Sequence, residues 1–139
     1  MILDNNLFNL DVQMTDKEEK MFLLVKSELQ NVLIPNIYSN NKIKHAMYGH
    51  CHHASLALYK LLGGKDEGYK LQKAIDELGI IHYWLINKDN LILDVTAEQY
   101  TDLGRPLPYC NKIDNRASYR VTKATKKIID NITNQSLKP

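Results

Sequence analysis

The part of the chain that most constrains its fold is a run of β-branched and aromatic residues, followed by a turn and a second apolar run. Residues 80–86 read Ile-Ile-His-Tyr-Trp-Leu-Ile, and residues 91–96 read Leu-Ile-Leu-Asp-Val-Thr. Asn-Lys-Asp-Asn at 87–90 separates them, and such residues favour turns. The pattern predicts an antiparallel hairpin over 80–96, so the fold must contain a sheet.

Helices are expected before and after this hairpin in the sequence. Thr15 and Glu18 form a capping-box pattern ahead of apolar residues at helical spacing. Gly63 and Gly64 follow another helical stripe as a left-handed C-cap. The expected elements are helices over 16–33, 50–62 and 122–132 and a strand over 69–75. Together they predict an α+β fold in which residues 1–139 form a single domain.

Composition excludes several classes of protein. The chain has 139 residues, of which 44% are hydrophobic and 24% charged, as in a typical globular domain. Its net charge of +2 is too small to indicate nucleic-acid binding. No apolar run approaches the roughly 20 residues that cross a bilayer, and Asp4 stands where a signal peptide would need basic and then apolar residues. We therefore expect a cytoplasmic protein without nucleic-acid or membrane partners.

The chain contains two cysteines, Cys51 and Cys110. In a cytoplasmic protein they are not expected to form a structural disulfide. Cys51 stands at the start of the helix expected over 50–62, where the helix dipole and unpaired N–H groups stabilise a thiolate. Cys51 is therefore a candidate nucleophile, whereas Cys110 is interpreted as incidental.

Two polar residues interrupt the apolar strands of the hairpin. If the turn has an odd number of residues centred near Lys88 or Asp89, His82 and Asp94 share one face within side-chain reach. A carboxylate among apolar side chains needs a hydrogen-bond donor, and an imidazole N–H is a suitable one. The sequence thus predicts a His82–Asp94 pair. With Cys51 it would supply a nucleophile, a proton carrier and an orienting acid.

Three short motifs resemble those of the transglutaminase-like, papain-like superfamily of cysteine enzymes. They are Tyr-Gly-His-Cys-His-His-Ala at 48–54, His-Tyr-Trp at 82–84 and Asp-Val-Thr at 94–96. Their order along the chain agrees with the Cys, His and Asp of that superfamily, and the region of resemblance spans about residues 48–100. In type the chain is also similar to small proteins encoded by bacteriophages.

The resemblance implies a nucleophile helix packed on an antiparallel sheet and a thioester formed on Cys51. It implies hydrolysis, deamidation or transfer of an amide or acyl group, with a protein or peptide substrate and no cofactor. His52 stands where eukaryotic transglutaminases carry Trp, so the choice of reaction stays open. The backbone N–H of Cys51 is the expected oxyanion donor. Residues expected to contact substrate or support the triad are Tyr48, His50, His52, Trp84 and Gln99.

Structural interpretations stay open for the same residues. Free cysteines are most often small buried hydrophobes, a histidine can be a satisfied core residue, and Asp94 can be a turn carboxylate. A second function class is a catalytically silent papain-like module that binds a protein partner. A third is a small zinc-binding protein using His50 and His53, one helical turn apart. The lysines of the last helix, Lys123, Lys126 and Lys127, are interpreted as its solvated face.

Overall fold

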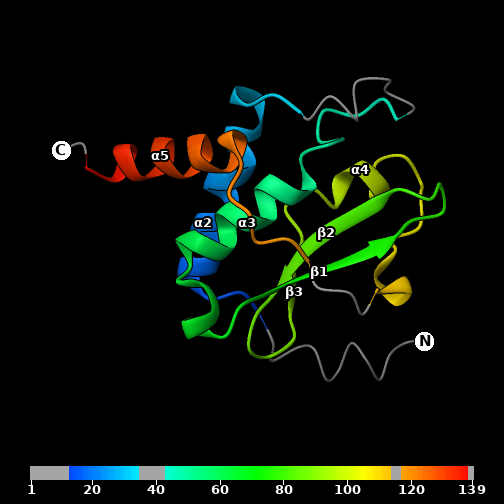
Figure 1. Cartoon of the computed structure of the whole chain (residues 1–139), viewed down its shortest axis with the longest axis horizontal. Coiled ribbons are helices and arrows are strands. Elements are labelled where there is room, and N and C mark those ends of the chain that lie inside the picture. The colour runs from blue at the N-terminus through cyan, green and yellow to red at the C-terminus, as the bar shows by residue number, and fades with distance from the viewer. Residues whose placement is uncertain (1–12, 35–42, 114–116, 138–139) are drawn as a thin grey trace.

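The predicted hairpin is present, and it belongs to a small antiparallel sheet. A computed structural model describes residues 13–34, 43–113 and 117–137. Strands pair in the order β1 (Lys70–Ile75), β2 (Ile81–Ile86) and β3 (Ile92–Leu93) (Figure 1). The strand expected over 69–75 is therefore present as β1, and it pairs with β2 along its whole length. The expectation about a signal peptide rests on Asp4, which lies outside the described residues.

The hairpin has the predicted register, but its second strand is shorter than expected. The β2–β3 pairs are Leu85–Leu93 and Ile86–Ile92. This register centres the turn on Asp89. β3 ends at Leu93 because the Asp94 carboxylate accepts a hydrogen bond of 3.2 Å from the Thr96 backbone N–H, which turns the chain out of the ladder. Placing Asp94 inside a strand was therefore wrong, since it lies in the turn that follows.

Along the chain, helices precede and follow the strands close to the positions expected from the sequence. The α-helices are α2 (Asp16–Glu28), α3 (Cys51–Leu61), α4 (Glu98–Thr101) and α5 (Lys123–Leu137), and the 3-10 helices are η1 (Leu29–Asn31), η3 (Gly64–Glu67) and η4 (Tyr109–Asn111). The first expected helix narrows to 3-10 geometry in its last turn, and the last one continues beyond residue 132. The sequence did not predict α4.

Local chemistry explains where α2 and α3 begin and end. Thr15 N donates to Glu18 Oε1 at 2.9 Å, and Glu18 N donates to Thr15 Oγ1 at 3.1 Å, which forms the predicted capping box of α2. Glu18 also accepts from the Tyr69 hydroxyl at 2.7 Å, so the start of α2 is tied to the chain just before β1. Gly63 has φ 102°, and this left-handed conformation stops α3 as the sequence predicts.

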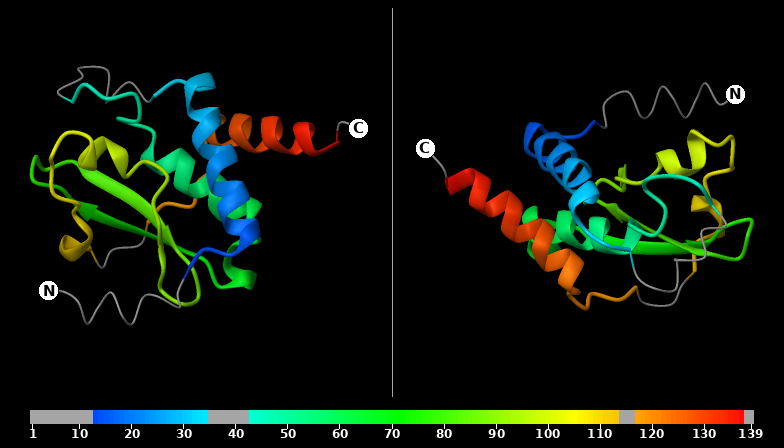
Figure 2. Two further views of the ribbon diagram at one scale, coloured as in Figure 1. Left: turned by 180° about the vertical axis from the view of Figure 1, so that it is seen from behind. Right: turned by 90° about the horizontal axis from the view of Figure 1, so that it is seen from above.

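The helices and the sheet pack in layers. α2, α3 and α5 gather on one side of the sheet, and α3 contacts both other helices and β2 (Figure 2). Leu85 of β2 faces this main core, whereas the alternating residues Trp84 and Ile86 pack with Ala74 and Tyr109 in a second cluster. The predicted α+β class is confirmed. Within the described ranges, no helix has the length and apolar character needed to cross a membrane.

Candidate active site

The start of α3 covers a part of β2 that β3 leaves open. The β2–β3 ladder contains only Leu85 and Ile86 of β2. Because Ile80 O accepts from Asp76 N on the β1 side, the alternation of an antiparallel ladder turns the carbonyl of Ile81 toward the opposite edge. The early part of β2 therefore needs donors from another element at this edge.

Two side chains of α3 supply these donors. Cys51, the first residue of α3, donates its thiol proton to Ile81 O at 4.0 Å. One turn later, the Ser55 hydroxyl donates to Tyr83 O at 3.3 Å. Cys51 is only 4% exposed. Its position follows both from the helix start that the sequence predicts and from the early end of β3, which the sequence did not reveal.

The structure brings His82 and Asp94 together in the interior. His82 Nε2 lies 2.7 Å from Asp94 Oδ2. Since a carboxylate only accepts, Nε2 carries the proton of this hydrogen bond. The side chains of His82 and Asp94 are 0% and 1% exposed, so the pair is shielded from water and from dissolved ions. Asp94 reaches His82 from the turn after β3, diagonally across the hairpin.

Further donors satisfy the Asp94 carboxylate. The Tyr109 hydroxyl donates to Oδ2 at 2.7 Å, the same oxygen that His82 contacts. On the other oxygen, Thr96 donates its backbone N–H at 3.2 Å and its hydroxyl at 3.4 Å. Four donors therefore satisfy the oxygens of this buried carboxylate. Asp94 is therefore equipped to hold a positively charged imidazole.

The charge state of His82 follows from these contacts. Burial lowers its pKa, but the hydrogen bond that His82 donates to Asp94 and the contact with Cys51 outweigh burial and raise the pKa to about 10. Among the described residues, His82 Nδ1 is the buried side-chain polar atom for which hydrogen-bond geometry identifies no partner. The neighbouring Cys51 side chain contributes to this rise in the pKa of His82. With Nε2 committed to Asp94, Nδ1 is the nitrogen that remains for exchange of a proton with Cys51.

Aromatic rings fix the imidazole in place. Trp84 is stacked beside His82 with ring centroids 5.9 Å apart, and Tyr100 packs edge-on at 4.8 Å. Tyr100 is itself held by its hydroxyl, which donates to the buried carboxylate of Asp76 at 2.9 Å, and by Arg105, which lies 4.4 Å above its ring. These contacts restrict the rotation of His82 and leave it little freedom beyond the Asp94 bond.

The structure places the residues that were expected to contact substrate or support the triad in different positions. Tyr48 is buried near Cys51: burial is the main cause that raises its pKa, Asp76 adds to the rise, and Cys51 contributes as well. Trp84 packs inside the second core cluster, where it donates to Gln72 Oε1 at 3.1 Å, so it supports the site from within. Gln99 is buried and donates to Thr96 Oγ1 at 3.1 Å, which stabilises the turn that carries Asp94.

The histidines beside Cys51 point to other partners. His50 Nδ1 and His53 Nε2 are 2.7 Å apart in the interior and hydrogen-bond to each other. Burial lowers the pKa of both, that of His53 to about 3 with further contributions from His50 and His52. His52 donates from Nε2 to Ser118 O at 2.7 Å and packs edge-on against Tyr83. In the part of the chain that the structure describes, no three His, Cys, Asp or Glu side chains gather as metal ligands, and the zinc alternative has no support here.

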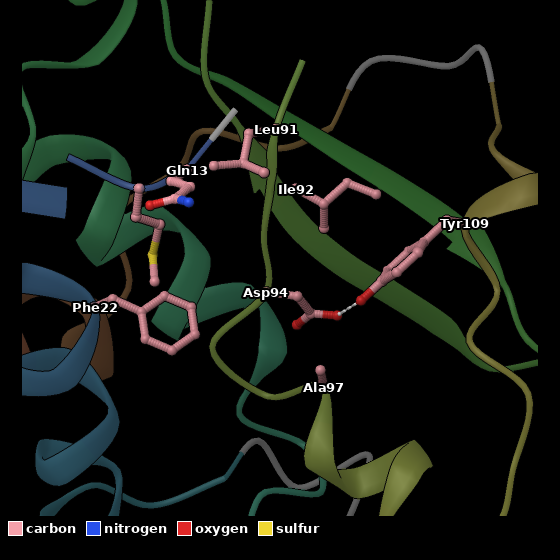
Figure 3. A pocket seen from close by; sticks show the side chains of 8 residues that line it. Gln13, Phe22, Leu91, Ile92, Asp94, Ala97 and Tyr109 are labelled. Atoms are coloured by element: carbon pink, nitrogen blue, oxygen red, sulfur yellow. Dashed lines mark hydrogen bonds between the residues drawn. The ribbon is translucent and has the colours of Figure 1, made fainter. Parts of the chain in front are cut away.

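An open hollow of about 540 Å³ borders the site on the Asp94 side. Apolar side chains line most of it, including Phe22 of α2, Leu91 and Ile92, while Asp94 and Tyr109 form its polar part (Figure 3). Cys51 and His82 do not line it. The Asp94–Tyr109 hydrogen bond, drawn dashed in Figure 3, therefore lies at the wall between the hollow and the His82–Asp94 pair.

Sequence reasoning missed Tyr100 and Tyr109. Both contact the His82–Asp94 pair, yet each comes from a short helical turn after the hairpin, α4 and η4 respectively. Neither segment has a periodic pattern that predicts which face it buries. Comparison of the chain with family models, curated proteins and solved structures finds no match.

Proposed function

We propose that this chain is a thiol-dependent acyl-transfer enzyme in which Cys51 is the nucleophile, His82 carries the proton and Asp94 orients the imidazole. One observation carries the proposal. His82 Nδ1 is buried and without an aligned hydrogen-bond partner, while Nε2 is held 2.7 Å from Asp94 and the Cys51 thiol lies close by. A buried polar atom left unsatisfied is rare in proteins, and a catalytic proton transfer is one reason for keeping one.

The reaction follows the usual course of a cysteine triad. Cys51 transfers its thiol proton to His82 Nδ1, and the thiolate forms a bond to the carbonyl carbon of an amide. The C–N bond then breaks, and the leaving amine takes the proton from Nδ1, which leaves a thioester on Cys51. Water or a second amine attacks the thioester while His82 accepts its proton, and the returning proton restores the thiol. Hydrolysis, deamidation and amide transfer differ only in these amine and water partners.

Two features of α3 suit this chemistry. Cys51 is the first residue of the helix, and the N–H groups of a first turn have no acceptor within the helix. The Cys51 N–H is therefore available to stabilise the oxyanion of a tetrahedral intermediate. The helix also packs against an antiparallel sheet that carries His82, as expected for the transglutaminase-like, papain-like superfamily. The substrate class proposed on that resemblance is an amide of a protein or peptide.

Alkylation of the two thiols tests the proposal. Cys51 is buried and Cys110 is exposed, so accessibility alone makes Cys110 the faster one. If His82 holds Cys51 as a thiolate, iodoacetamide at pH 6 is expected to modify Cys51 of a Cys110→Ser variant at least about ten times faster than Cys110 of a Cys51→Ser variant. Adding His82→Ala is expected to remove this advantage. Peptide mass spectrometry over a time course measures both rates.

An ordinary thiol titrates near pH 8.5, and a Cys51 rate that rises only through that range, or that is unchanged by His82→Ala, would show that the imidazole does not activate it.

A second function is favoured by the burial of the site. Cys51 is 4% exposed, and the hollow beside Asp94 does not extend to it. These facts suit a papain-like module that binds a protein partner without catalysis. In that case Cys51→Ala is expected to leave the affinity for the partner unchanged, whereas an enzyme loses turnover in the same variant.

A further inference from the structure

Tyr109 occupies an unusual position beside the proposed triad. It comes from η4, outside both strands of the hairpin, and its hydroxyl donates to Asp94 Oδ2 at 2.7 Å. Its ring packs edge-on against Trp84 with centroids 4.9 Å apart, which fixes where the hydroxyl points. The same ring borders the hollow (Figure 3). One side chain thus contacts the orienting carboxylate and, together with it, lines the hollow.

The shared oxygen is the important detail. Asp94 Oδ2 accepts from both His82 Nε2 and Tyr109, each at 2.7 Å. Two donors on one oxygen divide its negative charge between them, so the hydroxyl weakens the hold of Asp94 on the imidazolium. Burial and the Asp94 charge both raise the pKa of Tyr109, so the phenol stays protonated and remains a donor.

We propose that Tyr109 is a positioning residue of the site, which sets the orientation of the Asp94 carboxylate and moderates the basicity of His82. The catalytic meaning of this role rests on the proposed function, but the role itself is a property of the hydrogen bonds. A histidine that is held too strongly as an imidazolium returns its proton reluctantly, whereas general acid–base catalysis works best when the pKa lies near the working pH. Tyr109 acts against the contact that raises the pKa of His82.

Tyr109→Phe tests this role, because it removes the hydroxyl and keeps the ring against Trp84. Without the second donor, Asp94 Oδ2 holds the imidazolium more tightly. The midpoint of the His82 titration, followed by NMR of the ring protons between pH 7 and 11.5, is expected to move upward by about one pH unit.

The chain offers a matched control in Tyr69. Its hydroxyl also donates to a carboxylate at 2.7 Å, Oε2 of Glu18, at the start of α2. Tyr69→Phe removes the same kind of bond and is expected to leave the His82 midpoint unchanged. A Tyr109→Phe midpoint equal to that of the wild type, or an equal shift in Tyr69→Phe, would overturn the assignment.

The titration and the alkylation experiment fail separately. Slow alkylation of wild-type Cys51 at pH 6 refutes the proposed enzyme and leaves the His82 midpoints interpretable, because the imidazole titrates whether or not the thiol reacts. Normal alkylation with no shift of the midpoint in Tyr109→Phe refutes the role of Tyr109 alone.

Discussion

Replacing Asp94 with asparagine preserves the size of the side chain and removes the charge that holds His82. The Thr96 backbone N–H only donates, so the asparagine oxygen is expected to face it, as Asp94 Oδ1 does now. The asparagine NH₂ group then faces His82 Nε2, which must accept. The imidazole is then neutral with its proton on Nδ1, so it no longer carries the positive charge that would hold Cys51 as a thiolate.

The expected loss of stability follows from the pKa of His82. Burial lowers it, but the Asp94 hydrogen bond and Cys51 raise it from 6.5 to about 10. Because the raised pKa stabilises the protonated folded state, this contribution is fully present below pH 6.5 and is lost as the pH rises through about 10. A shift of this size corresponds to roughly 3–5 kcal/mol, the same range as the cost of breaking a buried ion pair. Asp94→Asn is therefore expected to lower the free energy of unfolding by about 3–5 kcal/mol at pH 7 and by much less at pH 10.5.

Urea unfolding followed by tryptophan fluorescence measures this difference. The chain contains one tryptophan, Trp84, which is 1% exposed and stacked beside His82. Glu18→Gln is the matched control, because Glu18 is a buried carboxylate whose side-chain donors, Tyr69 and Asn87, are neutral. Glu18→Gln is expected to lower the free energy of unfolding by the same amount at pH 7 and pH 10.5. An Asp94→Asn variant that loses equal stability at pH 7 and pH 10.5 would show that no His82–Asp94 ion pair exists.

Two further predictions concern the helices that frame the site. Thr15→Ala removes the hydroxyl of the α2 capping box and is expected to lower the free energy of unfolding, measured in urea, by about 1 kcal/mol. Thr122→Ser keeps a hydroxyl near the start of α5 and is expected to change this free energy little. Burial, with His50 and His52, lowers the pKa of His53 to about 3, so its stabilising effect is complete above pH 6.5 and is lost as the pH falls. Between pH 6.5 and 4.5 the wild type is expected to lose about 2–3 kcal/mol. His53→Gln is expected to flatten this dependence, whereas His52→Gln, which removes only the smallest of these contributions, is expected to keep most of it. An unchanged slope in His53→Gln would contradict the neutral histidine pair.

The sequence predicts the parts of the fold that depend on local chemistry. Branched and aromatic residues at alternate positions predict β2, the capping box predicts the start of α2, and the turn residues around Asp89 set the register that brings His82 near Asp94. Each of these signals acts over a few residues. The contact between His82 and Asp94 could be predicted because two polar residues buried in an apolar hairpin have few other partners.

Long-range packing accounts for what the sequence did not predict. Tyr100 and Tyr109 reach the site from short turns, and nothing near them in the chain specifies contact with His82 or Asp94. The end of β3 could have been predicted from the local sequence, but the strand-forming residues around it favoured a longer strand. Asp and Thr two residues apart, as at 94 and 96, are well suited to an Asx turn, which removes the carboxylate from the ladder.

The two-residue length of β3 has a consequence for redesign of this chain. A third strand as long as β2 would satisfy the carbonyls of Ile81 and Tyr83 with backbone N–H groups, and the sheet would be more regular. Those carbonyls are where Cys51 and Ser55 anchor the beginning of α3, so the same change would displace the helix from the strand edge. A variant optimised for a complete sheet would gain backbone hydrogen bonds and lose the place where a sulfur atom meets a buried imidazole. In this fold, an incomplete ladder is a requirement for assembling the site.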